Sequence, residues 1–377
     1  MKIVIRILLA SLTVAQFACT SPVIEEKKTL KEGLKGAFYI GTALNLDQIT
    51  GKDRQGVAVL EKHFNAIVAE NCMKSMEIHP EEDRYDFTYP DQFVALGEKY
   101  NMFITGHTLI WHSQLPAWFY VDEQGENVSA EVLKSRMKEH ITTFINRYKG
   151  RVKGWDVVNE AIMEDGSYRN SKFYEILSEE FIPLAFQYAQ EADPEAELYY
   201  NDYNEWYPEK RKTVVRLIRT LKERGIRIDG IGMQGHFNMD SPSIQEYEET
   251  ILEYAAEGVK VMVTELDLSI LPSPRQDVGA DLSTNFDYQK ELNPYTEGVP
   301  KEVMAAWDNR MNDFFKLFLK HSDVVSRVTL WGISDSDSWK NNFPVRGRTD
   351  YPLLFDRNHQ SKAVVQMIID EATEMNK

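Results

Sequence analysis

Three stretches of the chain repeat one pattern of hydrophobic and polar positions. In each stretch a helix with apolar residues at helical spacing ends at a glycine, and a short apolar run follows. A glycine at the C-terminal cap followed by a run rich in β-branched residues predicts βα units around a parallel sheet. The predicted helices span 136–148, 212–224 and 244–256, and the predicted strands that follow them span 154–160, 230–236 and 259–265.

Five further apolar runs predict strands, which raises the total to eight. Eight strands that alternate with helices in a chain of 377 residues favour an α/β protein. We predict a (β/α)8 TIM barrel in a single domain rather than an open doubly wound sheet. The additional strands are expected over 36–43, 64–69, 102–107, 196–201 and 327–331.

The glycines at 230, 232 and 235 have the spacing of a dinucleotide-binding loop. They lie within a predicted strand, however, and not in a strand-to-helix turn where a phosphate would bind. The sequence therefore predicts no dinucleotide site, and we expect no cofactor.

The N-terminal segment has the layout of a secretory signal. Lys2 and Arg6 precede an apolar run over 7–15, which is too short to span a membrane, and Cys19 follows directly after Ala18. Cys19 occupies the position of the lipid-modified cysteine of a bacterial lipoprotein, although the two residues before Ala18 depart from the usual signal. Ordinary signal cleavage and an uncleaved anchor remain the alternatives.

The predicted organisation is a signal peptide over 1–18, a tether or fold entry over 19–35 and the barrel domain over 36–377. We therefore expect an exported protein, either an outer-membrane or cell-surface lipoprotein or a periplasmic or secreted form. If Cys19 is lipidated, Cys72 is the only free thiol and no intrachain disulfide forms. We expect a monomer.

The net charge of −16 limits the kinds of partner that the protein can bind. An acidic surface repels nucleic acid and anionic lipid, whereas a neutral polysaccharide is not repelled. Nucleic acid is therefore excluded as a partner, and a carbohydrate is not.

Polar and aromatic side chains follow seven of the eight predicted strands. The carboxyl ends of barrel strands meet on one face, where active sites are built. These side chains are therefore expected in one cleft, although they are far apart along the chain. They are Glu70, Asn71 and Lys74, His107, Trp111 and His112, Asn159 and Glu160, Asn201 and Asp202, Gln234 and His236, Glu265 and Asp267, and Trp331 and Trp339.

Two of these residues, Glu160 and Glu265, end very apolar strands. Glycosidic hydrolysis needs one protonated carboxyl to assist the leaving oxygen and one ionised carboxyl to meet the oxocarbenium-like carbon. The fourth and seventh predicted strands face each other across the barrel, so the two carboxyls can flank a bound sugar. The pair predicts hydrolysis with retention and carboxyl groups about 5–5.5 Å apart.

Four ordered motifs then resemble glycoside hydrolase family 10, the family of endo-β-1,4-xylanases. They are FNAIVAENCMK at 64–74, GHTLIWHSQLP at 106–116, WDVVNEA at 155–161 and TELDLS at 264–269. The resemblance runs from about residue 36 to the C-terminus. It implies a retaining endo-hydrolase on a (β/α)8 barrel that acts on xylan or xylo-oligosaccharides.

The resemblance also implies roles for the matched residues. Glu160 would be the acid/base, and Glu265 would be the nucleophile that forms a covalent glycosyl-enzyme intermediate. Asn159 would bind the sugar 2-hydroxyl, and His236, oriented by Asp267, would hydrogen-bond Glu265. The same subsite would be lined by Lys74, His107, Trp111 and Gln234, and the next sugar would be held by Glu70 and Asn71. Both sugars would be covered by Trp331 and Trp339. Tyr203 would offer an aromatic platform on the leaving-group side.

Other interpretations stay open. A β-1,4-glucanase could use the same glutamate pair, and a non-catalytic glycan-binding protein would suit the anchor. His107 and His112 do not have the spacing of a metal pair, and His359 shows no site context, so no metal is expected. The segment 272–300 lacks periodicity and is expected to fold over the leaving-group side. Branch tolerance, chain-length preference and endo versus exo action are not predicted.

Overall fold

In the computed structural model, which describes residues 28–274, 280–283 and 286–375, eight parallel strands close into a barrel. The pairings of β6 with β8 and of β1 with β9 complete the ring. The predicted TIM barrel is therefore confirmed. In order around the barrel the strands are β1 (Tyr39–Leu44), β2 (Ala66–Ala69), β3 (Phe103–Trp111), β4 (Gly154–Asn159), β5 (Glu197–Asp202), β6 (Gly230–Met233), β8 (Lys260–Ser269) and β9 (Val325–Leu330).

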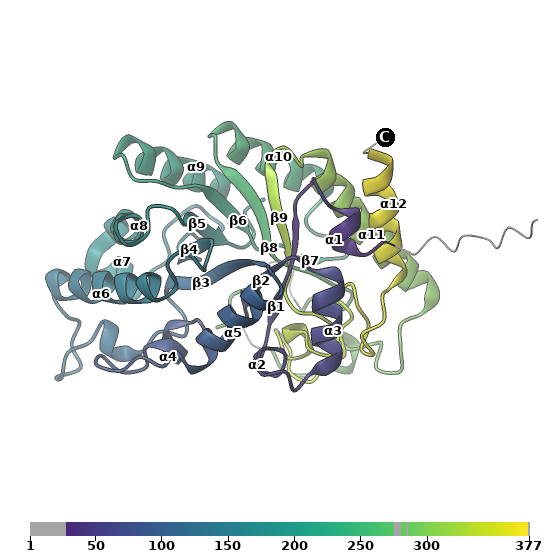
Figure 1. The fold of residues 1–377 in the computed structure, drawn as a ribbon, viewed down its shortest axis with the longest axis horizontal. Helices are drawn as coiled ribbons and strands as arrows, with labels where there is room; N and C mark the ends of the chain where they lie inside the picture. Colours follow the sequence, from purple (N-terminus) through teal and green to yellow (C-terminus); the bar gives the residue numbers. More distant parts are fainter. Residues whose placement is uncertain (1–27, 275–279, 284–285, 376–377) are drawn as a thin grey trace, which may run out of the picture.

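Helices surround the strands on the outside of the barrel (Figure 1). The longer ones are α3 (Arg54–His63), α5 (Thr88–Lys99), α6 (Ala130–Tyr148), α8 (Phe181–Ala192), α9 (Pro208–Glu223), α10 (Ile244–Ala256), α11 (Lys301–Lys320) and α12 (Ala363–Met375). The shorter ones are α1 (Leu30–Gly33), α2 (Leu46–Ile49), α4 (Ser75–Ile78) and α7 (Lys172–Leu177), with 3-10 turns η1 (Ala117–Phe119), η2 (Ser178–Glu180), η3 (Lys290–Leu292) and η4 (Trp339–Asn341).

Two predicted helices begin earlier than their hydrophobic pattern indicates, for reasons found at their N-termini. Ser129 caps α6, and its hydroxyl accepts a hydrogen bond from the backbone N–H of Val132. Pro208 occupies the first turn of α9, where its missing N–H leaves no helical hydrogen bond unmade. By contrast, α10 has the predicted bounds, because the capping box of Ser243 and Glu246 sits directly before its first apolar residue.

The predicted strand over 230–236 is divided in the structure. It consists of β6 and a second short strand, β7 (His236–Asn238), with Gly235 between them at a φ of +85°. This left-handed backbone is favourable for glycine and redirects the chain. As a result β7 pairs with β8 and sets His236 beside Asp267.

The start of the described chain packs onto its end. Helix α1 lies beside α12 (Figure 1), where Gly33 faces the side chain of Ile369. This helix falls within the segment expected to be a tether or fold entry. The predicted signal peptide and Cys19 lie outside the described residues. Within the described part of the chain, no helix is both long enough and apolar enough to cross a membrane.

Candidate active site

A cavity of about 140 Å³ lies at the carboxyl ends of the barrel strands. Twelve of the sixteen residues expected there from the strand ends line it: Glu70, Asn71, Lys74, His107, Trp111, Asn159, Glu160, Gln234, His236, Glu265, Trp331 and Trp339. The other four, His112, Asn201, Asp202 and Asp267, are not part of its lining. The convergence expected from the polar strand ends is therefore what the fold produces. Gln114, Ala280 and Leu282, which the sequence pattern did not single out, complete the lining.

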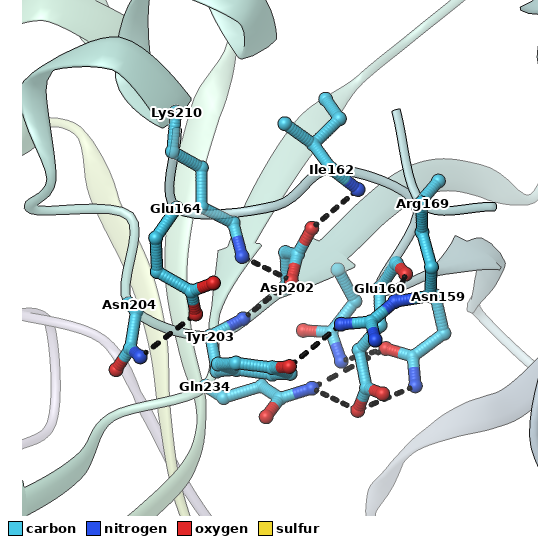
Figure 2. Close-up of polar contacts among 12 residues, drawn as sticks. Asn159, Glu160, Ile162, Glu164, Arg169, Asp202, Tyr203, Asn204, Lys210 and Gln234 are labelled. Atoms are coloured by element: carbon cyan, nitrogen blue, oxygen red, sulfur yellow. Dashed lines mark hydrogen bonds and ion pairs between the residues drawn. The ribbon is translucent and has the colours of Figure 1, made fainter. Parts of the chain in front are cut away.

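Glu160 follows β4 directly and has a φ of +57°, a left-handed conformation that is unfavourable for a residue with a Cβ. Its Oε1 accepts hydrogen bonds from Nε2 of Gln234 at 2.9 Å and from Nδ2 of Asn159 at 3.2 Å. Its Oε2 accepts one from the indole Nε1 of Trp111 at 2.8 Å. Figure 2 shows Gln234 and Asn159 converging on this carboxyl group, which is thereby held in one orientation.

The surroundings of Glu160 favour its protonated form. Burial raises the pKa of its carboxyl group to about 7, and the negative charges of Asp202 and Glu265 act in the same direction. The hydrogen bonds from Gln234 and Trp111 oppose this rise. A carboxyl group with this pKa can give up a proton near neutral pH, which is what a general acid requires.

Glu265, on β8, has the opposite tendency. Burial alone would raise the pKa of its carboxyl group, but the hydrogen bond from His236 and the electrostatic influence of the nearby histidines lower it overall. Nε2 of His236 lies 3.3 Å from Oε2 of Glu265, and Nδ2 of Asn201 donates to Oε1 at 2.8 Å. Glu265 is therefore ionised beside a protonated Glu160, as a paired-carboxyl mechanism needs.

His236 is held by a second carboxylate. Its Nδ1 lies 2.9 Å from Oδ2 of Asp267, which also accepts a hydrogen bond from the indole of Trp339 at 2.7 Å. Although burial lowers the pKa of His236, the charge of Asp267 and the contact with Glu265 raise it overall. His236 can thus donate to Glu265 while Asp267 fixes its ring.

An amide bridge connects the two glutamates. Nδ2 of Asn201 contacts both Oε1 of Glu265 and Oδ1 of Asn159 at 2.8 Å, and Asn159 contacts Glu160. The hydroxyl of Thr264 donates to Oδ1 of Asn201 at 2.6 Å, which fixes the orientation of that amide. Asn201 was among the polar strand ends, but its contact with Glu265 depends on a side-chain direction that the sequence pattern does not give.

The opposite wall of the cavity joins charged and aromatic groups. Lys74 donates to Oδ1 of Asn71 at 3.0 Å and lies 4.9 Å from the ring centroid of Trp111. His107 contacts the edge of Trp331, and its Nδ1 lies 2.9 Å from Oδ2 of Asp156. Asp156, which contacts His107, was not among the predicted site residues. Its only signal in the sequence is that it is a charged residue inside an apolar strand.

Tyr203, which was predicted to offer an aromatic platform to the sugar, does not line the cavity either. Its side chain is only 2% exposed, so it does not present the open aromatic face that we expected. Its hydroxyl accepts a hydrogen bond from Arg169 at 2.6 Å, and Nζ of Lys210 lies 4.4 Å from its ring centroid. Arg169 thus contacts the hydroxyl end of Tyr203, as Figure 2 shows, and Lys210 lies near the ring.

Arg169 connects this region to the segment 272–300. Its Nε donates to the backbone carbonyl of Glu160 at 2.9 Å, and its Nη1 lies 3.2 Å from Oδ2 of Asp281. Ala280 and Leu282, on either side of Asp281, line the cavity. The described part of the segment therefore reaches the site. Arg169 lies in a loop without periodicity, and no sequence pattern identified it.

A model of glycosyl hydrolase family 10 matches residues 29–371, nearly the whole chain. The chain belongs to this family. The resemblance drawn from the four sequence motifs is thus confirmed.

Relatives within the family match over most of their length. Endo-1,4-beta-xylanase A of Xylanibacter ruminicola is 48% identical, over 92% of this chain and 94% of that protein. A solved GH10 endoxylanase from a sugarcane soil metagenome is 44% identical, with a TM-score of 0.88, over 90% of this chain and 99% of that one. Xylanase XynB from Paenibacillus barcinonensis, solved with a conduramine derivative, is 38% identical with a TM-score of 0.83, over 92% of this chain and 99% of that one.

Proposed function

We propose that this protein is an endo-1,4-β-xylanase that cleaves the xylan backbone with retention of anomeric configuration. The observation that supports this most directly is the opposite displacement of two carboxyl pKa values in one cavity, upward at Glu160 and downward at Glu265. Similar proteins that bear the name endo-1,4-beta-xylanase support the choice of substrate.

The first step forms a glycosyl-enzyme ester. The ionised Glu265 attacks the anomeric carbon while Glu160 gives its proton to the departing glycosidic oxygen. Bond formation to Glu265 removes its negative charge, one of the influences that keep the pKa of Glu160 high.

The second step releases the sugar. The pKa of Glu160 falls once Glu265 is esterified, so Glu160 acts as a base and takes a proton from water. The water oxygen attacks the anomeric carbon from the face that the leaving group vacated, and the Glu265 carboxylate departs. Two inversions give net retention. We expect Asn159 to contact the sugar 2-hydroxyl during both steps.

Xylan is preferred over glucan because of the shape of the cavity walls. Glu70, Lys74 and Trp339 lie in the same small cavity as the catalytic pair. They leave little room for the hydroxymethyl group that distinguishes glucose from xylose. Tryptophan faces match the apolar faces of pyranose rings, and the charged and amide groups meet their hydroxyls.

Hydrolysis assays on two polymers test the proposal. We expect reducing sugar from xylan and little from carboxymethylcellulose, and proton NMR should show the β-anomer of the product first. Glu265→Ala should bind xylan and release no sugar. Equal hydrolysis of both polymers would instead support a β-1,4-glucanase. If the wild type and Glu265→Ala bind xylan equally and neither releases reducing sugar, the protein is a glycan-binding protein and not a hydrolase.

We also propose that the protein is exported as a monomer and that Cys19 is its lipid-anchor position. The support is the arrangement of Lys2, Arg6, the apolar run and Cys19 in the sequence. Labelled fatty acid should enter the full-length chain and should not enter Cys19→Ser. If neither chain is labelled and the protein is found in the soluble fraction, ordinary signal cleavage is favoured. Gel filtration tests whether the protein is a monomer.

A further inference from the structure

Three side chains that offer metal-ligand atoms meet outside the catalytic cavity, although they come from distant parts of the chain. Asp53 is the N-cap of α3, Asp337 lies in the loop after β9, and His359 lies in the turn before α12. Their ligand atoms all lie within 4.8 Å of one another. Nε2 of His359 is 3.6 Å from Oδ2 of Asp53 and 4.0 Å from Oδ2 of Asp337.

The two carboxylates lack a cationic partner that would balance their charge. Within the described ranges, their only ion-pair contacts shorter than about 4 Å run to His359, and no lysine or arginine reaches them. Nε2 of Gln48 donates to both Oδ2 atoms, at 2.9 and 3.3 Å, and so holds the carboxyl groups toward each other. Two partly buried like charges held in this way favour the binding of a cation.

Local structure fixes the position of each carboxylate. Oδ1 of Asp53 caps α3 by accepting the backbone N–H of Gly56 at 2.8 Å, which leaves Oδ2 turned toward His359. A Cβ at residue 56 would lie 2.1 Å from that Oδ2, so only glycine leaves room for it. The hydroxyl of Ser334 donates to Oδ2 of Asp337 at 3.0 Å.

His359 presents an unused nitrogen to this pair. Neither ring nitrogen makes a hydrogen bond in the described structure, although both are shielded from solvent and the side chain is 13% exposed. The distances to the carboxylates exceed hydrogen-bond length. The two carboxylates therefore contact Nε2 at ion-pair distance only, and no hydrogen bond compensates the loss of hydration at the ring nitrogens.

We propose that Asp53, Asp337 and His359 form a binding site for a divalent transition-metal ion of the zinc class. Tetrahedral zinc, with bonds of about 2.1 Å, holds its ligand atoms roughly 3.4 Å apart. The histidine-to-carboxylate separations are 3.6 and 4.0 Å, and all three ligand atoms lie within 4.8 Å, so binding would draw the ligands closer together. One imidazole and two carboxylates are a zinc-type donor set, and water supplies the fourth ligand. Calcium is disfavoured because it takes oxygen ligands.

The ion would connect the first βα loop of the barrel to the last. Asp337 is two residues before Trp339, which contacts Asp267 in the catalytic cavity. A bound ion would therefore stabilise the folded chain and restrain the loop that bears Trp339. It would take no part in bond cleavage, since none of the three ligands lines the catalytic cavity.

Titration with zinc chloride alone tests the site. After dialysis against EDTA, the wild type should bind one Zn²⁺ by calorimetry, and its melting temperature should rise by roughly 2 °C or more in excess zinc. Co²⁺ in place of Zn²⁺ should give the intense visible absorption of a tetrahedral site. Asp337→Asn and His359→Gln should each weaken Zn²⁺ binding at least tenfold and abolish the cobalt spectrum.

A matched control distinguishes the site from general surface binding. His321 pairs with Glu248 at 2.6 Å on another face of the protein, so His321→Gln removes a histidine–carboxylate pair without changing the proposed site. This variant should retain the full zinc response. The proposal fails if the wild type gains no stability from zinc, or if Asp337→Asn and His359→Gln respond as the wild type does.

Discussion

Trp111 donates its indole hydrogen to Oε2 of Glu160 over 2.8 Å, at the carboxyl oxygen that Gln234 and Asn159 do not contact. This bond favours the ionised carboxyl group, whereas burial favours the protonated one and prevails. The pKa of Glu160 is thus set by two opposed influences. Its pKa of about 7 is the net result.

Activity should therefore decline as the pH rises through about 7, because Glu160 loses the proton that it gives to the leaving group. Trp111→Phe removes one donor to the carboxylate, so the basic limb of kcat/KM should move to higher pH by roughly half a unit. The pH profile of an aryl xylobioside measures this shift. Trp339→Phe is the control, since that indole contacts Asp267 and not Glu160, and it should leave the basic limb in place.

The acid limb should depend on the chain of contacts behind Glu265. Asp267 raises the pKa of His236, and His236 in turn helps to lower that of Glu265. Asp267→Asn weakens both effects, so the pKa of Glu265 should rise and activity should be lost at a higher pH than in the wild type. We expect kcat/KM at pH 6 to fall about tenfold or more. His236→Asn should move the same limb in the same direction. If the acid limb moved in only one of the two variants, the contacts from Asp267 through His236 would not control the pKa of Glu265.

Most of this arrangement could be predicted from the sequence, because the carboxyl ends of all the barrel strands lie on one face. Glu70 and Trp339 are far apart along the chain, yet both follow strands, so their meeting could be expected. Arg169 and His359 lie in loops whose paths depend on tertiary contacts, and no periodicity identifies them. Tyr203 follows a strand too, but its contacts with Arg169 and Lys210 cannot be read from the pattern.

Arg169 should act as a positioning residue for Glu160. Arg169→Lys keeps the charge but loses the simultaneous contacts with the Glu160 carbonyl, the Tyr203 hydroxyl and Asp281. We expect kcat on xylan to fall about tenfold with little change in KM, because the acid/base group is displaced in every step. Asp281→Asn removes only the contact with the segment 272–300 and should have a smaller effect. A change in melting temperature without a change in kcat would indicate a purely structural role.

The segment 272–300 should influence which products form. Ala280 and Leu282 line the cavity, so shortening the segment opens one wall. We expect a variant that lacks residues 280–283 to release a different set of oligosaccharides from glucuronoarabinoxylan than the wild type does. Product profiles on xylohexaose serve as the unbranched control. An unchanged profile on branched xylan would show that the segment does not contact the substrate.

Glu205 is a buried carboxyl group that the proposed mechanism does not use. It is 0% exposed, and neither of its oxygens has a hydrogen-bond partner within the described structure. Burial raises the pKa of this carboxyl group well above its ordinary value, and the nearby charge of Asp202 adds to the effect. The folded protein therefore keeps a proton on Glu205 that the unfolded chain releases near its ordinary pKa.

The sign of the pH effect follows from this difference. Protonated Glu205 makes its full contribution to the free energy of unfolding below the unfolded-state pKa of about 4.3. As the pH rises from there toward the folded-state pKa, this contribution is lost by up to about 1.4 kcal/mol per pH unit. Glu205→Gln cannot ionise, so it should melt at nearly the wild-type temperature at pH 4 and several degrees higher at pH 8. Calorimetry at both pH values measures this, with Glu61→Gln on the exposed face of α3 as control. If Glu205→Gln melted below the wild type at pH 8, the carboxyl group would have to be ionised and paired in the folded protein.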